Sequence, residues 1–133
     1  MKKLVASLAS ALLLVLVGSA WSHEMHMGAH PAAVRTVTGE LVDTGCYLQH
    51  AARGEKHVSC ASKCIANGMP MGLLTADGSL YLLTMNHDNA DPYNKLKDMA
   101  GKTVKVTGVV MARNGMKGID VTDAALATAV SAK

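Results

Sequence analysis

Three cysteines and one histidine lie close together in this sequence. They are Cys46, His57, Cys60 and Cys64, all within 19 residues. A helix from His57 to Cys64 would place three of these side chains within an arc of about 60°, because an α-helix turns by about 100° per residue. Thiolates and an imidazole on one face are ligands for a soft metal ion. We therefore expect the chemistry of the chain to reside in this cluster.

The residue types also restrict the choice of metal. Three thiolates and one imidazole suit Zn(II) or Cu(I). The usual zinc knuckle is Cys-x-x-Cys, whereas Cys60 and Cys64 are separated by three residues. Met69 and Met71 follow the cluster, and thioethers favour Cu(I). We expect a Cu(I) site, with Zn(II) as the alternative, in a protein for metal trafficking, sequestration or tolerance.

Two other interpretations of the cysteines remain open. Cys46 could form a disulfide with Cys60 or Cys64, which would leave one unpaired thiol in a disulfide-stabilised domain that binds a protein or a small ligand without metal. A thiol-disulfide oxidoreductase is the third interpretation. The chain lacks the Cys-x-x-Cys element of thioredoxin-like proteins, so we expect no enzymatic activity. Asp43 is expected to be an ordinary carboxylate at a strand end, and the alternative is that it orients His57.

A second set of metal-binding side chains occurs in residues 23–33, HEMHMGAHPAA. This segment has little apolar content and is predicted to be a flexible tail. The histidine and methionine side chains of the tail are those of His23, Met25, His26, Met27 and His30. They are a secondary candidate site for copper. The alternative is a solvated tail without function.

Residues 1–22 have the layout of a secretory signal peptide. Two lysines precede an apolar run, which is followed by small residues. Cleavage is predicted after Ser22, or alternatively after Ala20. The apolar run is too short for a spanning anchor, and no second hydrophobic segment follows it. We expect a periplasmic or secreted product without stable membrane insertion, whose partners are a metal ion and, as a further option, another exported metalloprotein.

Charge and aromatic content argue against nucleic-acid binding. Without Lys2 and Lys3, 11 basic side chains face 10 acidic ones. Binding to single-stranded nucleic acid needs aromatic side chains in a basic groove. Only three tyrosines follow Ser22, and phenylalanine is absent from the whole chain. We therefore expect no nucleic-acid partner.

The remaining pattern predicts five strands and two helices. β-Branched runs and turn residues predict strands at 34–43, 71–75, 79–85, 103–111 and 118–122. Gly39 is expected to be a bulge or a bend. Helices are predicted at 57–66, ended by Asn67-Gly68, and from Asp91-Pro92, with Asp91 as the N-cap, to Gly101. Residues 123–133 are expected to be a C-terminal tail.

This element order predicts a mainly β domain over residues 34–122. It resembles an OB-fold, a five-stranded Greek-key barrel with one helix between strands three and four, and here with a short Cys-bearing helical insert between strands one and two. The strings GELVDTGCY and HVSCASKCIANGMP also resemble small exported bacterial OB-fold-like proteins with a cysteine, then His-x-x-Cys-x-x-x-Cys, then a Gly-x-Pro turn. The resemblance implies a shared site without specifying an activity.

Overall fold

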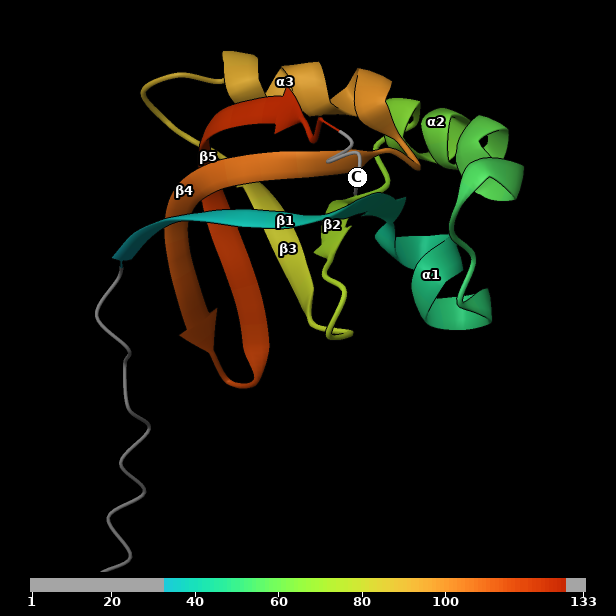
Figure 1. Ribbon diagram of the computed structural model, residues 1–133, viewed down its shortest axis with the longest axis horizontal. Helices are drawn as coiled ribbons and strands as arrows, with labels where there is room; N and C mark the ends of the chain where they lie inside the picture. The colour runs from blue at the N-terminus through green and yellow to red at the C-terminus, as the bar shows by residue number, and fades with distance from the viewer. Residues whose placement is uncertain (1–32, 129–133) are drawn as a thin grey trace, which may run out of the picture.

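The computed structural model describes residues 33–128, which form a closed five-stranded barrel (Figure 1). Around the barrel the strands follow the order β1-β2-β3-β5-β4, and β4 pairs with β1 to close it. All pairs are antiparallel except β3 with β5. The strands are β1 (Ala33–Asp43), β2 (Met71–Leu74), β3 (Leu80–Met85), β4 (Thr103–Arg113) and β5 (Met116–Leu126). The expected OB-fold-like barrel is confirmed.

Two groups of helices lie outside the barrel wall. The insert between β1 and β2 contains α1 (Thr44–His50), the 3-10 helix η1 (Glu55–His57) and α2 (Val58–Ala66). The connection from β3 to β4 contains α3 (Asp91–Leu96) and the 3-10 helix η2 (Lys97–Met99), which cover one end of the barrel (Figure 1). Among the residues that the structure describes, no helix is long and apolar enough to cross a membrane.

Aliphatic side chains from all five strands fill the barrel. Leu41, Leu73, Leu83, Val104 and Ile119 are each at most 3 % exposed. Side chains from α2 and from the α3–η2 segment pack into the same cluster: Ala61, Ile65, Leu96 and Ala100. The cysteine-bearing helix is therefore attached to the barrel through its own apolar side chains.

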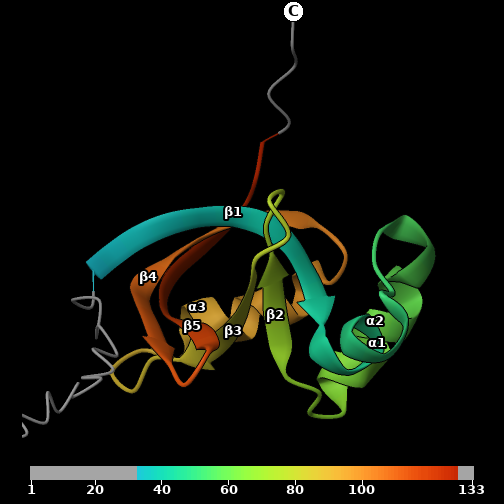
Figure 2. The same cartoon turned by 90° about the horizontal axis from the view of Figure 1, so that it is seen from below.

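β1 pairs with two different strands along its length, and Gly39 lies next to the residue where the pairing strand changes. β1 pairs with β4 from Ala33 to Glu40 and with β2 from Glu40 to Asp43. Neither ladder has a bulge at Gly39; instead β1 curves around the barrel (Figure 2). A Cβ atom on Gly39 would lie 2.6 Å from the carbonyl oxygen of Leu74. Glycine is therefore required here because two backbones approach closely.

The structure differs from the sequence-based elements at several boundaries. β5 extends to Leu126, so part of the expected C-terminal tail at 123–133 is strand. β1 begins at Ala33, inside the expected tail at 23–33. The N-cap of α3 is Ala90, and Asp91 is its first residue. The insert has a further helix, α1, which the sequence analysis did not predict.

The close approach at Gly39 predicts a specific sensitivity. Gly39→Ala should lower the free energy of unfolding by about 2 kcal/mol, because the new methyl group has to displace backbone atoms of Leu74. The matched control is Gly118→Ala in β5, whose Cβ would meet its nearest neighbouring atom, the Leu82 carbonyl oxygen, at 3.3 Å. Urea denaturation measures both. Equal losses in the two variants would contradict the argument.

Candidate metal centre

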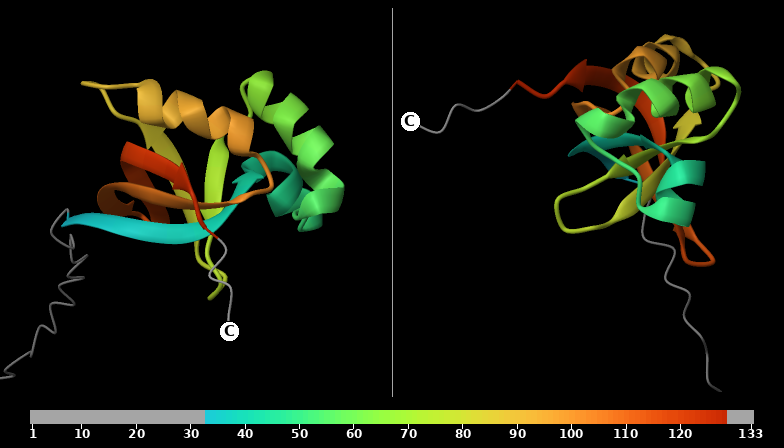
Figure 3. Two further views of the ribbon diagram at one scale, coloured as in Figure 1. Left: turned by 45° about the horizontal axis from the view of Figure 1, so that its top comes forward. Right: turned by 90° about the vertical axis from the view of Figure 1, so that its right-hand side faces the viewer.

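Three successive elements of the insert carry the four predicted ligands. Cys46 lies in α1, His57 is the last residue of η1, and Cys60 and Cys64 lie in α2. α1 and α2 lie at the same end of the barrel (Figures 2 and 3). The insert thus brings Cys46 next to residues that follow it by 11 to 18 positions.

The start of α1 sets the position of Cys46. Asp43, the last residue of β1, is the N-cap, and its Oδ1 accepts a hydrogen bond of 2.8 Å from the backbone N–H of Cys46. α1 ends at Ala51, which adopts a left-handed conformation with φ of 53°. Cys46 therefore lies in the first turn of a helix that directly follows the predicted strand at 34–43.

The packing of α2 sets the positions of Cys60 and Cys64. Ala61 and Ile65 are buried against the barrel, one helical turn apart. Cys60 directly precedes Ala61, and Cys64 directly precedes Ile65. Both thiols therefore lie beside the buried face of α2. α2 ends at Ala66 with Asn67 as its C-cap, which agrees with the predicted stop at Asn67-Gly68. His57 precedes α2 as its N-cap residue, although it was expected within the helix.

The ligand atoms converge in two overlapping groups. In the first group, one ring nitrogen of His57 and the Sγ atoms of Cys46 and Cys60 all lie within 4.8 Å of one another. In the second, an Asp43 carboxylate oxygen and the Sγ atoms of Cys46 and Cys64 do the same. Cys46 belongs to both groups and joins them. The four predicted residues form a Cys3His group that could hold a metal ion.

Asp43 has a larger role in the site than its position at the end of a strand indicates. Its side chain is completely buried, with 0 % exposure. Oδ2 lies 3.1 Å from Nε2 of His57. The expectation of an ordinary strand-end carboxylate was wrong, because this carboxylate is buried and contacts His57. The contact is a precondition of the alternative, in which Asp43 orients His57. The only sequence signal was its position three residues before Cys46, which is the spacing of an N-cap to its hydrogen-bond donor.

The buried carboxylate and the thiols change one another's proton affinity. A hydrogen bond to Asp43, together with burial and the charge of this carboxylate, raises the pKa of Cys46 to about 12. Burial and a hydrogen bond with Cys60 raise the pKa of Cys64. Burial alone would raise the pKa of Asp43, but hydrogen bonds from Cys46 and His57 outweigh burial, so its pKa is lowered. A metal ion that binds here must therefore displace thiol protons.

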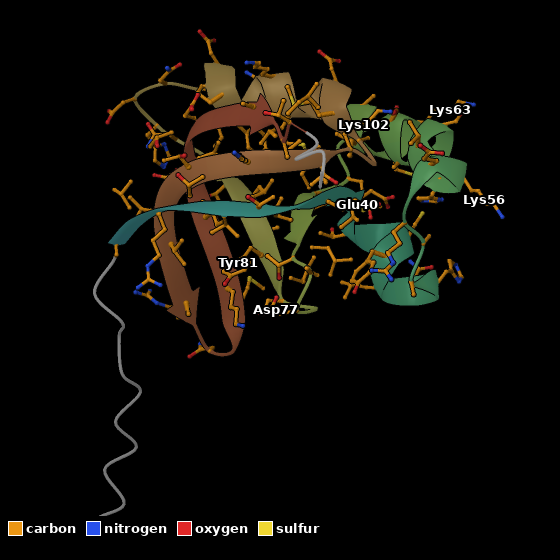
Figure 4. The ribbon with its side chains drawn as sticks, in the orientation of Figure 1. Glu40, Lys56, Lys63, Asp77, Tyr81 and Lys102 are labelled. Carbon is orange, nitrogen blue, oxygen red and sulfur yellow. The ribbon has the colours of Figure 1, made fainter. Side chains whose placement is uncertain are left out.

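The group opens to solvent on one side. Cys60 is exposed, Cys46 and Cys64 are half-buried, and the His57 side chain is 19 % exposed. Lys56 and Lys63 of the same segment point away from the barrel (Figure 4). A metal ion or a small reagent can therefore reach Cys60 without opening the barrel.

The secondary candidates have different positions. The thioether of Met69 packs over Gly45, the neighbour of Cys46, where a Cβ on Gly45 would lie 2.7 Å from its Sδ. Met71 is 1 % exposed and belongs to the barrel core, so its side chain has a packing role. The tail residues His23, Met25, His26 and Met27 lie outside the described residues. Met69 is thus the predicted thioether that lies against Gly45, the residue before Cys46.

Comparison with known proteins adds no relative from which a role could be inferred. No family model matches the chain, and neither the curated proteins nor the solved structures gave a significant match. The chemistry of the group therefore has to be argued from its own geometry.

The free thiols predict a defined labelling pattern. In the structure all three cysteines are free, and Cys60 is the most accessible. Alkylation of protein from which the metal has been stripped under anaerobic conditions, without reductant, should label three thiols, with Cys60 first and Cys46 slowest, because the reactive species is the thiolate and the pKa of Cys46 is raised to about 12. Intact-mass and peptide analysis over time measures this. One labelled thiol with one blocked pair would instead establish a disulfide.

Proposed function

We propose that this protein binds a soft metal ion, preferentially Cu(I), through Cys46, Cys60 and Cys64, with His57 as an additional ligand. It would carry or sequester the ion in the periplasm or outside the cell. The observation that carries the proposal is the convergence of Cys46, His57 and Cys60, whose ligand atoms lie within 4.8 Å of one another. Distances of this order let a central ion contact all three atoms after small side-chain rotations.

The accessibility of the group favours transfer over a structural role. A structural zinc site is closed and supplies part of the folding free energy. Here the barrel has its own aliphatic core, and Cys60 is exposed to solvent. An exposed thiolate ligand can be replaced by a thiolate of a partner, so the ion can pass from one protein to another. This supports a role as a carrier or as a sequestering protein.

The surroundings of the group favour a monovalent soft ion. Cu(I) is satisfied by two or three sulfur ligands, and its affinity for thioethers is high. The thioether of Met69 lies against Gly45, next to Cys46. The Asp43 carboxylate lies within 4.8 Å of two of the sulfurs and attracts a cation. Zn(II) is the second ion that we consider, since it would use His57 to complete a tetrahedron.

The expected export of the chain supports the same function. Thiols in a periplasm or outside the cell are oxidised unless a metal ion or a reducing system protects them. A bound Cu(I) ion would protect all three. Thiol-disulfide catalysis is not part of this proposal, because catalysis requires a thiolate of lowered pKa, whereas the pKa of Cys46 and that of Cys64 are both raised.

A disulfide-stabilised binding module is the second candidate function. It is favoured by one observation: Cys46 Sγ lies within 4.8 Å of the sulfur of Cys60 and within 4.8 Å of that of Cys64. Either pair could be oxidised after a small movement. The labelling experiment above separates this candidate from the metal-binding proposal.

Removal of one thiol should abolish metal retention. Purified protein should hold close to one equivalent of copper or zinc by elemental analysis, and Cys60→Ser should lose most of it, because a hydroxyl is a poor ligand for either ion. Ser59→Ala, at the neighbouring exposed position of α2, is the matched control and should retain the metal. Wild-type protein that binds neither ion would overturn the proposal.

Removal of the metal should leave the fold intact. The barrel core consists of aliphatic side chains and contains none of the four ligands. Far-UV circular dichroism after chelation should therefore match that of the loaded protein, with stability reduced only by the mass-action contribution of the bound ion. A zinc-finger-like loss of structure on chelation would contradict the carrier model and would indicate a structural site.

A further inference from the structure

Asp43 is the one charged side chain that is buried among the described residues. Its two oxygens have different partners: Oδ1 accepts from the backbone N–H of Cys46 at 2.8 Å, and Oδ2 lies 3.1 Å from Nε2 of His57. A buried carboxylate is costly unless both oxygens are matched by donors. The first contact caps the N-terminus of α1. The second contact links Asp43 to a proposed ligand, His57, 14 residues further along the chain.

We propose that Asp43 is a positioning residue that holds His57 as a nitrogen ligand, and that this contact gives the centre its affinity for a divalent ion such as Zn(II). The inference rests on the proposed metal-binding function and specifies which residue controls the choice of ion. Asp43 contributes through His57 and is not itself the ligand.

The tautomer of His57 follows from the hydrogen bond. An ionised carboxylate has no proton to donate, so Nε2 must carry the proton of the contact with Oδ2. In a neutral imidazole the other nitrogen, Nδ1, then has the free lone pair. Nδ1 is thus the atom of His57 that can bind a metal ion. Many metal-binding histidines are fixed in this way by a carboxylate on their second nitrogen.

The dependence on the ion follows from coordination number. Zn(II) requires four ligands in a tetrahedron, so three thiolates leave one position for His57. Cu(I) is satisfied by the sulfurs of Cys46, Cys60 and Cys64. Loss of the contact between Asp43 and His57 should therefore weaken the binding of a divalent ion and leave Cu(I) binding almost unchanged.

The geometry allows one competing arrangement. Asp43 also forms a group with Cys46 and Cys64, so its carboxylate could bind the ion directly. A direct ligand would contribute to affinity whether or not His57 is present. A positioning residue would contribute nothing once His57 has been removed. A double-mutant cycle distinguishes the two.

Asp43→Asn is the appropriate variant because it retains the size of the side chain and one oxygen. That oxygen can still accept from the Cys46 N–H, and asparagine is a good N-cap. The amide NH2 group would then face Nε2 of His57 as a donor. This change favours the tautomer protonated on Nδ1 and thereby removes the lone pair that the metal ion needs.

The experiment measures binding of Co(II), as a spectroscopic substitute for Zn(II), and of Cu(I), in competition with a coloured chelator. The proteins are wild type, Asp43→Asn, His57→Ala and the double variant. Each single substitution should lower Co(II) affinity by about 10- to 100-fold, and the double variant should match His57→Ala. Cu(I) affinity should change by less than about 3-fold. Asp98→Asn, an exposed carboxylate in η2, is the control and should bind both ions like the wild type.

Three outcomes would overturn the inference. If Asp43→Asn weakens Co(II) binding as much in the His57→Ala background as alone, Asp43 is a direct ligand or a purely structural residue. If it weakens Cu(I) and Co(II) equally, the contact does not select the ion. If Co(II) binding is unchanged, the contact has no influence on the metal.

A measurement on metal-free protein separates this inference from the function on which it rests. The nitrogen-15 spectrum of His57 should show a proton on Nε2 in the wild type and on Nδ1 in Asp43→Asn. A wild-type proton on Nδ1 would overturn the positioning role even if metal binds. If no metal binds but the proton is on Nε2, the proposed function fails, and the contact of Asp43 with His57 serves only the fold.

Discussion

A fully buried carboxylate must be matched by hydrogen-bond donors, and this requirement at Asp43 organises the whole cysteine-bearing insert. β1 carries the carboxylate to the end of the barrel, where the ladder with β2 fixes its backbone. One donor is the backbone N–H of Cys46 in the first turn of α1, so Asp43 caps the start of this helix. The other is His57, 14 residues after Asp43, so the chain has to fold back over α1 before α2 starts. Matching one buried charge therefore brings the first cysteine close to the other three ligands.

The barrel core makes this arrangement possible because it is complete without the ligands. Aliphatic side chains from five strands fill the interior, and Ala61 and Ile65 attach α2 to it. The burial of these two residues leaves Cys60 free to remain exposed. Stability and metal chemistry are thus assigned to different faces of the same helix. Substitution of a ligand should change binding much more than folding, whereas substitution of Ile65 should change both.

The sequence predicts the parts of this structure that depend on apolar periodicity. The strand order and α2 follow from alternating residues and from turn residues such as Asn67. α1 has no buried residue, so it has no apolar pattern to detect; it exists because Asp43 caps it and because Ala51 ends it. The C-terminal part of β5, residues 123–126, was not predicted as strand. Only Ala124, a small residue, is buried there, and its neighbours are exposed. Sequence spacing likewise could not separate Met71, which fills the core, from a methionine beside the cluster.

The Cys3His group itself was predicted from the sequence. The contact between Asp43 and His57 was predicted only as the alternative, because it depends on the return of the chain over 14 residues, which local patterns do not encode.

Charge balance explains why this centre has to remain partly open. Three thiolates and the Asp43 carboxylate would together carry four negative charges, and neither Cu(I) nor Zn(II) neutralises them. An excess of charge in a closed, apolar cavity is costly, since Coulomb repulsion and lost hydration both increase as the local dielectric constant falls. Without the ion, the raised pKa of Cys46 avoids this cost by keeping a proton on the thiol. With the ion, the excess charge has to be solvated, and Cys60 is the ligand in contact with water. The exposure of Cys60 is thus a consequence of collecting so many anionic ligands around one buried carboxylate, and the same exposure makes the ion accessible to a partner.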